Sequence, residues 1–188
     1  MLRLLTTSAI VSLGLIAALP VAAQTTPSIH PGGATADQNT LNQEDRTFAK
    51  EAAFGGLAEV ELSKIAQKSE NPDVKRFADR MVQDHTAANE QLMQIATGLG
   101  LELPKALDSE HQRAREKLET LHGKAFDDQY MRDMVADHDK VVSLFQQEER
   151  SGQDAELKQF AQKTLPTLEE HQKMAVELSH KLSQTAAR

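Results

Sequence analysis

The sequence contains no cysteine, no tryptophan and a single tyrosine among its 188 residues. Without cysteine the chain can form no disulfide and has no lipobox thiol, so packing must stabilise it and a lipoprotein anchor is excluded. Acidic residues outnumber basic ones by 28 to 21, and the basic residues form no cluster, which argues against nucleic-acid partners and anionic membrane surfaces. The motifs of nucleophilic and phosphate-binding sites are also lacking, so we expect no catalytic residues and favour a protein that is not an enzyme.

The first 23 residues have the layout of a secretory signal peptide, with Arg3, an apolar run over 4–19 and small residues before a cleavage site after Ala23. An uncleaved N-terminal anchor is the alternative, but the run is short for a membrane span, which needs about 20 apolar residues. We therefore predict a soluble periplasmic or secreted protein that keeps no membrane span after cleavage.

Residues 24–41 are rich in Thr, Pro, Gly, Gln and Asn and are predicted to form a flexible linker, whereas residues 42–185 have the pattern of long helices. Apolar residues recur there at three- and four-residue steps in four long segments, near 42–69, 71–98, 124–150 and 154–185. A shorter helix is expected over 109–121, opened by a capping box from Ser109 to Gln112. Gly55 and Gly56 fall inside the first helix and weaken it, which suggests that a neighbouring helix approaches closely there.

Two segments of the chain repeat each other. Residues 81–85 (Met-Val-Gln-Asp-His) match residues 134–138 (Met-Val-Ala-Asp-His), and residues 73–78 parallel residues 156–161. Two such hairpins predict an all-α, ferritin-like four-helix bundle with a short extra helix in the connection. The connection is long enough to run the length of the bundle, which favours a single crossover, although an up-down-up-down bundle capped by the short helix remains open.

Several motifs also resemble one known family. They are the segments 48–53, 56–62, 152–154 and 163–168, together with both Met-Val-x-Asp-His phrases. Across residues 42–178 the chain is similar to the domain-of-unknown-function family 4142. The resemblance implies an exported protein of ferritin-like fold, often labelled predicted outer membrane protein, and it supplies no activity to transfer.

One polar residue falls on the apolar face of each long helix: Glu59, His85, His138 and His171. Buried imidazoles and carboxylates need partners, and helical bundles build metal sites from side chains of this kind on facing helices. At a rise of about 1.5 Å per residue, Glu59 and His85 differ in depth by roughly 6 Å, and the two later histidines by roughly 7 to 8 Å. These offsets predict a partial cluster rather than a tight four-ligand site.

Two interpretations of these residues remain open. In the first they form a buried hydrogen-bonded layer that fixes the register of the helices without a ligand. In the second they bind a transition metal, with Met81 and Met134 as further candidate ligands, because thioether and imidazole together suit copper. Methionine is also the common filler of irregular cores. Asp84 and Asp137 precede their histidines by one residue, so we expect them to face adjoining helices.

A di-iron oxidase is disfavoured, because such a site needs a Glu-x-x-His motif on each of two helices and a glutamate from each of the other two, whereas the motif Glu119 to His122 lies on the short connecting helix. The sequence thus predicts a non-catalytic periplasmic binding or stress-related module with a Glu/His polar layer. The alternative is a ferritin-like protein that binds copper, zinc or iron. The partner is not identified, and a homo-oligomer remains open.

Overall fold

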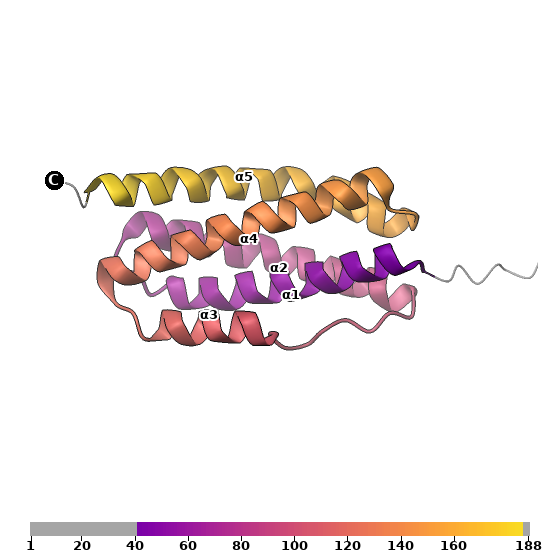
Figure 1. The fold of residues 1–188 in the computed structure, drawn as a ribbon, viewed down its shortest axis with the longest axis horizontal. Coiled ribbons are helices and arrows are strands. Elements are labelled where there is room, and N and C mark those ends of the chain that lie inside the picture. Colours follow the sequence, from indigo (N-terminus) through magenta and orange to yellow (C-terminus); the bar gives the residue numbers. More distant parts are fainter. Residues whose placement is uncertain (1–40, 186–188) are drawn as a thin grey trace, which may run out of the picture. The chain divides into compact units, whose positions relative to one another are not determined.

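The computed structural model describes residues 41–185, which form five α-helices (Figure 1). They are α1 (Gln43–Ala66), α2 (Pro72–Gly98), α3 (Ser109–Glu119), α4 (Gly123–Ser151) and α5 (Ala155–Thr185). The predicted signal peptide at 1–23, and all of the predicted linker except its last residue, lie outside the described residues. Within the described part, no helix combines the length and the apolar character that crossing a membrane requires.

The helix starts follow from local side-chain chemistry. Asn71 and Asp154 cap α2 and α5, since their side-chain oxygens accept hydrogen bonds from backbone N–H groups of the first turn. The predicted capping box at Ser109 is wrong. Asp108 is the cap of α3, because its carboxylate accepts the N–H of His111 at 2.9 Å and Ser109 is already inside the helix.

The topology is that of two antiparallel hairpins joined by one crossover. In Figure 1, α1 and α2 run in opposite directions, and the connection carrying α3 then returns along the bundle, so that α4 starts beside the α1–α2 turn. Consequently α4 runs parallel to α2. The hairpins pack through α1 with α4 and α2 with α5, and α3 lies against α1 and α4. This is the predicted ferritin-like crossover bundle, and the up-down-up-down alternative is excluded.

The core of the bundle is divided into two apolar clusters. One contains Phe48, Phe145 and Phe160, whose rings pack in T-shaped and tilted pairs with centroids 5.0 to 6.4 Å apart. The other contains Tyr130 and the buried methionines of α2 and α4. Along each long helix one buried polar residue separates the two clusters: Glu59, His85, His138 and His171. The fold therefore places a polar layer across the middle of an otherwise apolar bundle.

Candidate functional site

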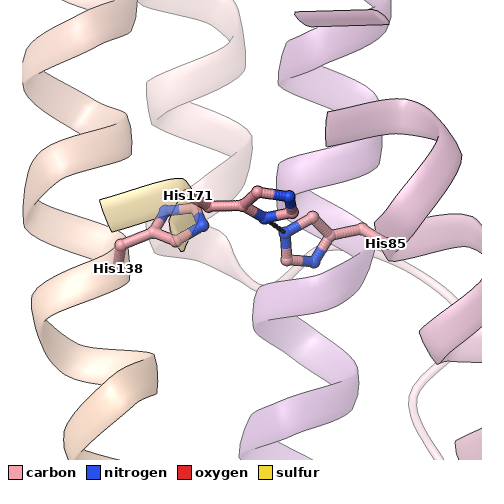
Figure 2. Close-up of side chains that lie close together, drawn as sticks. All are labelled: His85, His138 and His171. Carbon is pink, nitrogen blue, oxygen red and sulfur yellow. Dashed lines mark hydrogen bonds between the residues drawn. The ribbon is translucent and has the colours of Figure 1, made fainter. Parts of the chain in front are cut away.

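The polar layer brings together one residue from each long helix. Glu59, His85, His138 and His171 are exposed by only 1%, 4%, 0% and 0%. Figure 2 shows the three imidazoles, from α2, α4 and α5, turned toward one another. One ring nitrogen of each histidine lies within 4.8 Å of the others, and the ring centroids are 5.2 to 5.6 Å apart. We call these three histidines the histidine trio.

Two rings of the trio are oriented by carboxylates on their outer nitrogens. His85 Nδ1 lies 2.9 Å from Glu59 Oε2, and His171 Nε2 lies 2.9 Å from Asp84 Oδ2. An ionised carboxylate only accepts hydrogen bonds, so the nitrogen that faces it carries the hydrogen. In a neutral ring the other nitrogen then keeps its lone pair, and for both rings that nitrogen faces the trio.

The inner nitrogens of these two rings, His85 Nε2 and His171 Nδ1, lie 3.2 Å apart. The line Glu59–His85–His171–Asp84 contains three such contacts, and each needs one hydrogen, but two neutral imidazoles supply only two. The missing hydrogen is replaced either by an extra proton or by a cation between the two rings. Two nitrogens bound tetrahedrally at 2.0 to 2.1 Å from one ion would be about 3.3 Å apart. The observed spacing therefore fits two ligands of one metal ion.

The third ring repeats this arrangement with a backbone acceptor. His138 Nδ1 lies 2.9 Å from the carbonyl oxygen of Met134, one helical turn earlier, which orients the ring and leaves its Nε2 with the lone pair. Among the described residues, Nε2 has no hydrogen-bond partner although it is fully buried. Both carboxylate oxygens of Glu59 are likewise buried and accept no well-aligned hydrogen bond: Oε2 lies 2.9 Å from His85 Nδ1, and Oε1 lies 3.4 Å from His138 Nδ1. Unpaired buried groups are costly, and a bound cation would satisfy the free nitrogen of His138.

The electrostatics keep the layer in the protonation state that binds metals. Burial and the neighbouring His85 lower the pKa of His171 to about 4, against the opposing effect of Asp84. Burial also lowers the pKa of His138, against the opposing effect of Glu59. Both rings are thus neutral at pH 7, as a metal ligand must be. Burial alone would raise the pKa of Glu59, but the three histidines together lower it to about 2, so this carboxyl is ionised.

The two aspartates of the repeated phrase have different surroundings. Asp84 turns from α2 toward His171 on α5, as expected, and pairs with Arg80, which also reaches Glu170 at 3.1 Å. Burial alone would raise the pKa of Asp84, but Arg80 and His171 lower it. Asp137 instead lies in a surface pocket, where burial and the charge of Glu59 raise its pKa to about 6.

The structure departs from the sequence interpretation in how closely the four residues meet. The estimated depth offsets predicted only a partial cluster, yet side-chain length and the stagger of the hairpins bring all four into contact. Met81 and Met134 have fully buried side chains in the apolar cluster of Tyr130. Glu119 and His122 line a different pocket, beside the α1–α2 turn. The roles of Asp84 and of the Met134 carbonyl were not predicted, although the Asp-His repeat did point to the former.

The comparisons with known proteins agree with this fold. A family model described as Domain of unknown function (DUF4142) matches residues 30–178. The chain belongs to this family. The bundle of this DUF4142 protein is similar to a DUF305 fragment from Deinococcus radiodurans, with a TM-score of 0.66 and 14% identity over 75% of this chain and 98% of that one. It is also similar to a DUF305 protein from Streptomyces coelicolor, with a TM-score of 0.63 and 18% identity over 74% and 94%. Such distant likeness shows the fold alone, and no curated protein matches the DUF4142 chain.

Proposed function

We propose that this DUF4142 protein is a non-catalytic module that binds a divalent transition-metal ion through His85 Nε2, His138 Nε2 and His171 Nδ1. The observation that carries the proposal is the acceptor group that lies 2.9 Å from the outer nitrogen of each ring: two carboxylates and one backbone carbonyl. Histidines that ligate metals almost always donate their other N–H to a group of this kind, which fixes the tautomer and the ring orientation.

The donor set favours a metal of borderline softness. Imidazole suits zinc, copper, iron and nickel, and the three nitrogens come without a thiolate. The ionised Glu59 supplies negative charge from the outer side of His85 and His138, which favours a cation in the trio. The layer is buried on all four helices, whereas a catalytic metal keeps an open coordination position for substrate. Binding is therefore favoured over catalysis.

A ligand-free polar layer is the second candidate, and one observation favours it. The carboxylate contacts of His85 and His171 would fix the helix register without any metal, provided that the line of residues holds one extra proton. That arrangement still leaves His138 Nε2 unpaired, so it accounts for less of the geometry than a metal does. In either case we infer an exported protein from the signal-peptide pattern, and the name of the Streptomyces coelicolor relative includes the word "secreted".

Titration calorimetry of the metal-free protein with Zn²⁺ and with Cu²⁺ tests the proposal. We expect one equivalent to bind with a Kd below about 10 μM. The variant His138→Gln should bind at least about 100-fold more weakly, since a ligand is lost. His180→Ala is the matched control, because this exposed histidine of α5 lies outside the layer. Absence of binding at 10 μM, or unchanged binding by His138→Gln, would contradict the proposal, and thermal unfolding of each variant checks that the bundle is intact.

A further inference from the structure

Two pockets among the described residues are lined by members of the polar layer, one of about 10 Å³ beside Glu59 and His85 and a larger one at the surface. The larger pocket is the wider route to the layer. It has a volume of about 330 Å³ and opens between α1, the start of α3 and α4. Glu59 is part of its lining and at the same time contacts His85 at 2.9 Å. The side chain of Glu59 therefore connects the pocket with the histidine trio, and both of its oxygens are buried without a well-aligned hydrogen bond.

The two glycines in the middle of α1 have different surroundings. A Cβ atom at Gly56 would meet Oδ1 of Asn89 at 2.0 Å, so the close approach of α2 requires this glycine, as the sequence suggested. A Cβ atom at Gly55 would meet nothing within 4 Å, and packing gives no reason for a residue that weakens the helix. Gly55 lines the pocket next to Glu59. Its missing side chain leaves open the space above that carboxylate.

The lining of the pocket is strongly acidic. Besides Glu59 it carries four carboxylates and one imidazole against a single lysine: Glu51, Asp108, Glu110, Asp137, His111 and Lys140. Lys140 is already paired with Glu110 at 3.2 Å. A concave surface with a negative excess concentrates cations and accelerates their association.

We propose that this pocket is the entry path of the divalent metal ion and that Glu59 passes the ion from the pocket to the histidine trio. The proposal rests on the proposed function, since it assumes that the trio is the destination. The rim attracts the hydrated ion, the gap at Gly55 admits it, and the carboxylate of Glu59 is the first buried donor that it meets. A path differs from a ligand in that it changes the rates of binding and release while leaving the affinity nearly unchanged.

The decisive variant is Gly55→Leu, which adds a side chain at the pocket, where a Cβ atom meets nothing within 4 Å, and which removes no ligand. Stopped-flow absorbance with Co²⁺ as the probe gives both rate constants. We expect association and dissociation to slow together by at least about tenfold, because the ion must displace a side chain, while Kd stays within about twofold. Gly98→Leu is the matched control, since a Cβ there also meets nothing and the site is remote from the pocket. It should keep the wild-type rates.

A second pair of variants tests the charge. Glu51→Gln combined with Glu110→Gln neutralises two exposed carboxylates of the rim. Glu156→Gln combined with Glu177→Gln makes the same change in net charge on exposed positions of α5. The rim pair should slow Co²⁺ association at low salt about threefold or more and flatten its salt dependence, and the α5 pair should not.

The outcomes separate this proposal from the proposed function. If Co²⁺ does not bind the wild-type protein, or binds His138→Gln equally well, the histidine site fails and the path fails with it. If Co²⁺ binds through the trio but Gly55→Leu and the rim pair both keep wild-type rate constants, the path alone is overturned.

Discussion

Two buried glutamates of the bundle have pKa values shifted in opposite directions. Glu59 and Glu148 are exposed by only 1% and 4%. The histidines around Glu59 bring its pKa down to about 2, although burial alone would raise it. Burial raises the pKa of Glu148 to about 7, and the nearby Asp45 and Asp154 add to that rise. The neighbours, and not burial by itself, thus decide which glutamate carries the charge that a cation needs.

The surroundings of Glu148 also show why the end of the bundle is not a second site. Asp45 accepts the backbone N–H groups of Gln153 at 3.1 Å and Asp154 at 2.8 Å, which ties the start of α1 to the α4–α5 turn. Glu148 packs beside this structural carboxylate and has an unpaired Oε1. Protonation of Glu148 reduces the repulsion among these acidic groups. In the polar layer, by contrast, imidazoles surround the charged carboxylate of Glu59.

The largest expected effect is the loss of the charged glutamate. Glu59→Leu removes the carboxylate from His85 Nδ1 and leaves a buried N–H without an acceptor. Removing one partner of a buried charged pair is strongly destabilising, so we expect the free energy of unfolding to fall by about 3 kcal/mol or more in urea denaturation. Glu148→Leu, measured alongside at pH 8, should not destabilise the protein comparably. Equal losses in the two variants would mean that the two environments do not differ.

Metal binding should raise the free energy of unfolding by an amount that grows with the free metal concentration. At a free Zn²⁺ concentration of 100 times Kd, a single site adds about 2.7 kcal/mol to the free energy of unfolding, provided that the unfolded chain does not bind. Differential scanning calorimetry of the wild type with and without Zn²⁺ measures this gain. His171→Gln should abolish it and Glu148→Gln should leave it intact. A gain that survives His171→Gln would place the ion elsewhere.

The raised pKa of Glu148 predicts that stability depends on pH with the opposite sign to that expected for an ordinary salt-bridged carboxylate. Its pKa is raised from 4.5 to about 7, so between these values the unfolded chain releases a proton that the folded chain keeps. Stability should therefore fall as pH rises from about 4.5 to 7 and remain lower above that range. Glu148→Gln should be more stable than the wild type by up to about 3 kcal/mol at pH 8, and nearly equal to it at pH 4.5. Urea denaturation at both pH values measures the difference, and a constant difference would refute the assignment.

The fold could be predicted largely from local patterns, because each long helix carries its own periodic face and three of the four begin with a side-chain cap. Asn71 and Asp154 are residue types that favour the cap position, and the repeated phrase correctly indicated two hairpins. The start of α3 was misassigned, since Asp108 and Ser109 are both good caps and only the backbone conformation distinguishes them.

The inward position of the four residues of the polar layer could be predicted, but their contacts with one another could not. The apolar faces pointed to Glu59 and the histidine trio as inward residues, whereas the way in which the hairpins meet follows from packing that one helix cannot reveal. For the same reason the contact between Asp84 and His171, 87 positions apart in the chain, could not be assigned from spacing. Glu148 was missed because it stands in the charged run Gln146–Arg150, which has the composition of a solvated surface.

The variant with the smallest expected effect distinguishes most directly whether a neighbouring charge contributes to the raised pKa of Glu148. Asp154→Asn keeps the cap of α5, since the side-chain oxygen still accepts the N–H groups of Glu156 and Leu157, both at 3.0 Å in the wild type. It removes one negative charge near Glu148, so the pKa of Glu148 should fall from about 7 by about one unit, with a change in stability of about 1 kcal/mol or less. Side-chain carboxyl chemical shifts, followed by ¹³C NMR through a pH titration, measure this directly, with Asp79→Asn on the exposed face of α2 as the control. If the pKa of Glu148 stays at about 7, the charge of Asp154 does not contribute to it, and burial together with Asp45 accounts for the contrast with Glu59.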